Sequence, residues 1–139
     1  MVVSTSLVAT MLRSASSLSD RAETRLVLSR LEEQWRTDAR AAVSAHLLPN
    51  ESGAALQLAD RTEIVYQADE HGVTRRESSA AGNRVDRFRL RHPDVEFSAD
   101  ARPGGTLLRI AIRHSPDGRR QQSRTTSIAA AVATREEAP

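Results

Sequence analysis

The segment LSRLEEQWRTDARAA, residues 28–42, carries apolar side chains at the spacing of one helical face. At about 100° per residue these positions fall into one stripe, which consists of Leu28, Leu31, Trp35, Ala39 and Ala42. Trp35 is the only Trp in the chain. We therefore expect this half of a helix to lie on a sheet of its own domain. The expected helix–sheet core consists of Leu31, Trp35, Ala39 and Val43.

The segment belongs to a longer region, residues 3–46, that contains neither Pro nor Gly. Such a region predicts one continuous helix of roughly 40 residues, about 60 Å long. A helix of this length is unusual in a compact domain. Pro49, Asn50 and Gly53 are expected to end it.

The first half of this helix has a different apolar stripe, turned by well over a quarter of a revolution from the second. Many Ser residues flank it. An apolar line that its own domain does not cover indicates a partner. We call this stripe the assembly face, and its members are Leu7, Met11, Ala15, Leu18 and Ala22.

Beyond Gly53 the apolar pattern changes from helical to alternating, which is typical of strands. Seven strands are predicted, at residues 54–58, 62–67, 73–77, 85–90, 95–101, 106–114 and 125–132. Residues 69–72 and 102–105 have the composition of hairpin turns. The predicted fold class is α+β, with one long N-terminal helix packed by its C-terminal half on an antiparallel sheet. Residues 1–26 form the protruding helix half, 27–133 the α+β domain and 134–139 a disordered tail.

Composition disfavours several classes of function. The formal net charge is +2 with a pI near 10.3, and every basic residue is Arg. The Arg residues are interspersed with Asp and Glu along the chain, whereas a nucleic-acid binder concentrates its positive charge on one face. The chain contains no Cys, so it has neither disulfides nor thiolate metal ligands. Residues 1–12 are too short to span a bilayer.

No constellation of catalytic residues is apparent. His46, His71, His92 and His114 occur singly, without the spacing of a metal site. Gly104-Gly105 precedes a predicted strand rather than a helix, so it fits a hairpin turn better than a phosphate loop. We expect no enzyme activity, no catalytic residues, no metal, no cofactor, no nucleic-acid partner and no small-molecule substrate.

The order of these features resembles the minor pseudopilins of type II secretion and type IV pilus-like systems. Their helix carries an aromatic residue, a basic residue, a variable residue, Asp and Ala, which is similar to Trp35-Arg36-Thr37-Asp38-Ala39 here. Residues 62–66, which end in Tyr66, and residues 73–77, which contain Arg75 and Arg76, are similar to the strand pair of that family. The resemblance implies a pilin-like fold.

The resemblance also implies a basic leader, a processing site and an apolar anchor of about twenty residues. None of them is seen in this sequence, and residues 2–12 look like the remaining tail of the anchor. With a longer N-terminus, the implied location is the inner membrane with a periplasmic domain. Without one, the protein would be soluble, in an unassigned compartment.

The function that the resemblance implies is structural: a non-enzymatic assembly subunit whose partners are other pseudopilins or pilin-like subunits. An alternative is a soluble α+β binding module with a homotypic helix interaction. Sustained heptads with charged flanks would favour that alternative, and the change of stripe along the helix disfavours it.

Overall fold

The computed structural model describes residues 3–91, 93–114 and 124–133. Within these ranges it describes side chains from residue 21 onward, except that of Glu51. The predicted tail at residues 134–139 lies outside the described residues.

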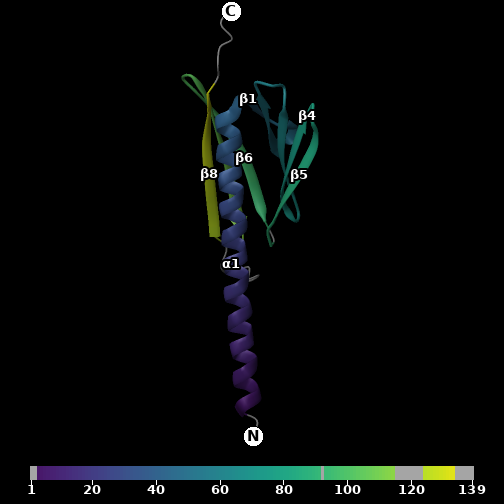
Figure 1. Ribbon diagram of the computed structural model, residues 1–139. Coiled ribbons are helices and arrows are strands. Elements are labelled where there is room, and N and C mark those ends of the chain that lie inside the picture. Colours follow the sequence, from purple (N-terminus) through teal and green to yellow (C-terminus); the bar gives the residue numbers. More distant parts are fainter. Residues whose placement is uncertain (1–2, 92, 115–123, 134–139) are drawn as a thin grey trace, which may run out of the picture.

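The described chain contains one α-helix, a short 3-10 helix and eight strands (Figure 1). The helices are α1 (Val3–Ala41) and η1 (Pro49–Glu51). The strands are β1 (Ala42–Leu47), β2 (Gly53–Leu58), β3 (Glu63–Asp69), β4 (Gly72–Ser79), β5 (Gly82–Arg89), β6 (Asp94–Arg102), β7 (Gly105–His114) and β8 (Arg124–Ala133).

The strands form two antiparallel sheets. Sheet A has the order β1-β2-β3-β4-β5 and sheet B the order β6-β7-β8. The two hairpin turns expected at residues 69–72 and 102–105 join β3 to β4 and β6 to β7. Gly72 has φ +140°, and a Cβ there would lie 2.0 Å from the carbonyl oxygen of Phe88 on β5. Only glycine fits this approach between strands.

Helix α1 runs along both sheets (Figure 1), and its most extensive contacts are with β8. Trp35 is fully buried where the helix and the two sheets meet. Its ring lies 4.7 Å from that of Tyr66 on β3, edge to face, and 6.2 Å from that of Phe97 on β6. Aromatic pairs at these distances contribute beyond simple burial. The Trp35 side chain therefore connects α1 to both sheets.

The predicted fold class, one pilin-like helix on one sheet, is wrong. The fold is mostly antiparallel β, with two sheets and one helix. In the part of the chain that is described, the eight strands hold more residues than α1 does. Alternation predicts which residues form strands but not which strands pair. Pro93, which cannot donate to a strand ladder, separates β5 from β6 and with them the two sheets.

The expected helix also ends earlier than predicted. It stops at Ala41, and Ala42–Leu47 form β1, paired antiparallel with β2. Val43 therefore lies in a strand rather than on the helix. It falls at a register shift between Ala42 and Ser44, where the ladder is irregular. The sequence lacks a Gly or Pro at this boundary, so no local signal marks it.

Candidate functional site

The first part of α1 extends beyond both sheets (Figure 1). The side chains of four assembly-face residues, Leu7, Met11, Ala15 and Leu18, lie outside the described part. The fifth, Ala22, is exposed. Leu26, one turn further along, is 65% exposed. Val27 and Leu28 are partly buried against the core, so the domain holds the helix from about this point.

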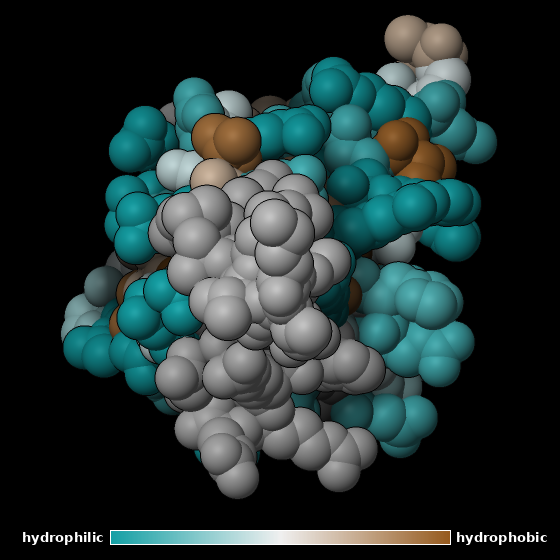
Figure 2. Space-filling view, turned by 90° about the horizontal axis from the view of Figure 1, so that it is seen from below, coloured by the Kyte–Doolittle hydropathy of each residue, from teal (hydrophilic) through white to brown (hydrophobic). Residues whose placement is uncertain are grey.

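The end of the β domain from which the helix projects is mainly hydrophilic. Figure 2 shows this end, with small apolar patches scattered over a polar surface. Leu26, near the base of the projecting segment, is by contrast an exposed apolar side chain.

The predicted helix–sheet core is distributed as follows. Leu31, Trp35 and Ala39 are buried in a cluster that contains residues of both sheets. Val43 is half-buried on β1. The structure therefore brings three of the four residues together on the covered face of α1.

A buried polar network centred on Asp38 lies next to this core. Asp38 is 4% exposed, and its carboxylate accepts four hydrogen bonds. Tyr66 Oη donates to Oδ2 at 2.5 Å. Arg75 donates through Nε to Oδ2 at 2.6 Å and through Nη2 to Oδ1 at 2.9 Å. Gln34 Nε2 donates to Oδ1 at 3.0 Å. The two-pronged Arg–carboxylate contact is the strong form of this pair.

The network continues from Arg75 toward the surface. Arg75 Nη1 donates to Asp86 on β5 at 3.1 Å and lies 3.5 Å from the Glu77 carboxylate. The exposed Arg84 forms an ion pair with Asp86, with Nη2 3.3 Å from Oδ1 and Nε 3.3 Å from Oδ2. The chain of contacts therefore links α1 to β3, β4 and β5 of sheet A.

Burial and charge act together in this network. Burial raises the pKa of Tyr66, and the neighbouring Asp38 carboxylate raises it further, so the phenol stays a proton donor. Burial opposes the charged form of Arg75, but the hydrogen bond and charge of Asp38 outweigh it and raise the pKa of Arg75. Both groups therefore keep the protonation state that binds Asp38 across the physiological pH range.

The arrangement suits a structural role rather than chemistry. Tyr66 and Arg75 are 0% and 3% exposed, so a substrate cannot reach them. The carboxylate oxygens of Asp38 are already occupied by four donors. The network fixes the rotation of α1 about its axis, because Asp38 and Trp35 must face sheet A together.

The sequence did not predict this network. Trp35, Asp38, Tyr66 and Arg75 all lie in the segments that carry the resemblance to pseudopilins. Their mutual contact has no local signal, since Tyr66 and Arg75 are 28 and 37 residues from Asp38. Gln34 and Asp86 were not singled out. The i, i+4 spacing of Gln34 and Asp38 could have suggested the first of these contacts.

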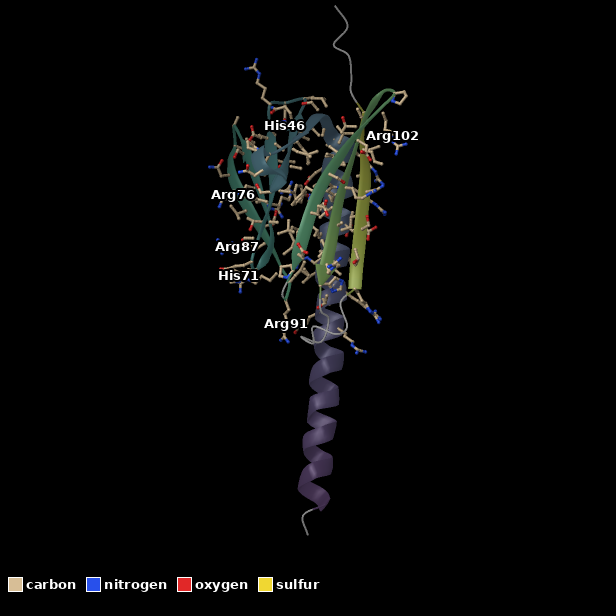
Figure 3. The ribbon with its side chains drawn as sticks, turned by 180° about the vertical axis from the view of Figure 1, so that it is seen from behind. His46, His71, Arg76, Arg87, Arg91 and Arg102 are labelled. Atoms are coloured by element: carbon tan, nitrogen blue, oxygen red, sulfur yellow. The ribbon has the colours of Figure 1, made fainter. Side chains whose placement is uncertain are left out.

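The described histidines do not form a cluster. Among the described residues no group of three or more His, Cys, Asp or Glu could hold a metal ion. His114 is buried, with Nε2 3.3 Å from Thr126 Oγ1 and no partner for Nδ1. His46 lies on the edge strand β1, and His71 lies in the turn between β3 and β4, near the opposite end of sheet A (Figure 3). His92 lies outside the described residues.

Two findings complete the description. Within the residues described, no helix has the length and apolar character needed to cross a bilayer. The chain matches no protein-family model, and no curated protein or solved structure is significantly similar to it. The fold and site together define a two-sheet antiparallel β domain fixed by a buried ion pair to a projecting helix.

Proposed function

We propose that the chain is a non-enzymatic assembly subunit of a type II secretion-like or type IV pilus-like filament. The first part of α1 associates with helices of other pseudopilin-like subunits, and the β domain stays on the periplasmic side. The single observation that carries this proposal is the extension of α1 beyond both sheets (Figure 1).

The rigid attachment of the helix supports the same role. A projecting helix can position a domain in an assembly only if it cannot rotate or slide against that domain. Burial of Trp35 between two sheets and the Asp38–Arg75 ion pair oppose both movements. Exposed Leu26 places apolar surface near the base of the projection, where a partner helix would begin to pack.

Site-specific cross-linking tests the proposal, and the absence of native Cys removes background. Leu18→Cys lies on the assembly face, and Ser16→Cys is the matched control because it points about 160° away on an ideal helix. Both chains are expressed in the source cells, oxidised and analysed by mass spectrometry. We expect Leu18→Cys to cross-link to other subunits with long N-terminal helices, and Ser16→Cys to cross-link far less.

Two outcomes would contradict the proposal. Cross-links only between copies of this chain would favour the alternative, a binding module with a homotypic helix interaction. Equal cross-linking of both variants would show that the projecting segment has no preferred face.

A further inference from the structure

The outer surface of sheet A carries a cluster of arginines that the proposed helix contacts do not use. Phe88 points into the core, so its neighbours Arg87 and Arg89 point outward from β5. Arg76 projects from the same side of β4 (Figure 3). Alternate residues of one strand lie about 7 Å apart, so Arg87 and Arg89 present two guanidinium groups side by side.

These arginines border a shallow depression of about 560 Å³ over β4 and β5. Two small residues of β4 also line it: Thr74 lies opposite Arg87, and Gly72 opposite Arg89. Arg76, Arg87 and Arg89 therefore line one hollow together with Gly72 and Thr74.

The positive charge of this surface is not compensated internally. Among the described residues, no carboxylate forms an ion pair with Arg76, Arg87 or Arg89. Asp69 also lines the hollow, and it accepts a hydrogen bond from the backbone N–H of His71. Glu63, opposite Ser78, is a second exposed carboxylate on this side of sheet A. The three guanidinium groups outnumber these carboxylates, so the surface attracts an anionic ligand.

The neighbouring residues indicate which kind of anion. Arg76 lies directly between Val65 on β3 and Val85 on β5, and Val85 is 50% exposed. Val65 is half-buried. An arginine beside accessible apolar surface is typical of protein interfaces. Among the described residues of sheet A, Tyr66 and Phe88 are both buried and face inward, so the outer surface has no Phe, Tyr or Trp on which bases could stack.

We propose that this surface, which we call the basic face (Arg76, Arg87, Arg89, Val65 and Val85), binds an acidic segment of a protein partner. Paired carboxylates would bind the guanidinium groups, and apolar side chains of the partner would cover Val65 and Val85. The inference does not depend on the proposed role of α1, because none of its residues lies on the helix.

The test uses the full chain and a short, fluorescently labelled synthetic peptide in which Glu-Glu and Val-Val pairs alternate, so that an extended chain presents both residue types on each side. Fluorescence anisotropy measures its binding, and amide chemical shifts locate it. We expect saturable binding that changes the amide chemical shifts of Gly72 and Thr74. The affinity should fall between 0.05 and 1 M salt, because the Debye screening length shortens to about 3 Å at the higher concentration. A peptide with Gln for Glu should not bind.

Arg87→Glu should weaken binding at least tenfold, since the reversed charge repels the peptide. Arg109→Glu is the matched control: it is an exposed strand arginine on sheet B, between Ser98 and Ala129. It should change the affinity by less than about twofold. Arg87→Gln, with a melting curve for each variant, separates loss of binding from loss of the fold.

Three results would overturn the proposal. Equal weakening by Arg109→Glu would mean attraction to general positive charge. Tighter binding of a single-stranded oligonucleotide, or of phosphatidylserine vesicles, than of the peptide would assign the face to another class of ligand. Absence of shifts at Gly72 and Thr74 would place the peptide elsewhere. None of these results bears on cross-linking through Leu18→Cys.

Discussion

At the scale of single residues, Asp38 connects α1 to sheet A. It is a buried charge with four donors, one of them from its own helix and three from strands of sheet A. Such a pair contributes little net stability compared with an apolar replacement, but breaking it leaves an uncompensated charge. The Asp38–Arg75 pair instead determines how α1 is placed relative to sheet A.

Asp38→Ala should therefore lower the free energy of unfolding by about 3–5 kcal/mol, because Arg75 stays buried without its main partner. Urea denaturation measures the change. Glu32→Ala is the control, since its ion pair with Arg36 is exposed and worth about 0.3–0.5 kcal/mol. Equal effects of the two substitutions would show that the buried pair is not what fixes the helix.

His114 makes stability depend on pH. Burial lowers the pKa of His114, and the charge of Arg124 lowers it further. The folded protein then binds the proton less readily than the unfolded chain, whose His has a pKa near 6.5. Stability should be full above about pH 7 and fall as the pH drops through 6.5 toward the lowered folded value.

Melting temperatures between pH 7.5 and 5 check this dependence. His114→Gln should flatten the profile, whereas His71→Gln, at an exposed position, should leave it unchanged. An identical slope in the His114 variant would assign the pH dependence to other groups.

At the scale of elements, sequence patterns predicted strands better than boundaries. All seven predicted strands are present, because alternation over a half-buried surface is a local property. β1 was missed for the same reason: residues 42–47 are compatible with a helix, and only pairing with β2 makes them a strand. The helix end at Ala41 is set by tertiary contacts rather than by a cap residue.

The change of environment along α1 leads to a prediction about this element. Leu31→Asp should destabilise the domain by about 4 kcal/mol or more, because an unpaired charge would enter the core at a fully buried position. Leu26→Asp should change the unfolding free energy by less than about 0.5 kcal/mol, since Leu26 is 65% exposed.

Thermal melts of the two variants make the comparison within one helix. A similar loss of melting temperature in both would mean that Leu26 is covered by the domain in solution. The boundary between the held and projecting parts of α1 would then have to move toward the N-terminus.

At the scale of the whole molecule, two sheets share one helix, and this arrangement was beyond the reach of local patterns. The helical stripe predicted that Trp35 faces a sheet, but not that Tyr66 of sheet A and Phe97 of sheet B would contact it together. Both contacts depend on where residues 90–93 divide the strands into two sheets. The basic face could not be predicted either, because Arg76 and Arg87 meet only through the pairing of β4 with β5.

The division of the molecule into a held and a projecting part predicts what truncation does. A chain that starts at Arg21 keeps the buried helix residues Leu31, Trp35 and Asp38 and removes a part of α1 that extends beyond the sheets (Figure 1). It should retain its fold, with a loss in unfolding free energy of less than about 2 kcal/mol from the altered helix start. It should also lose association with helical partners, which co-purification and light scattering measure. Binding of the Glu–Val peptide should persist, because the basic face is intact.

A truncated chain that unfolds would instead make the first twenty residues part of the domain, and the projecting helix would lose its role as a separate assembly element.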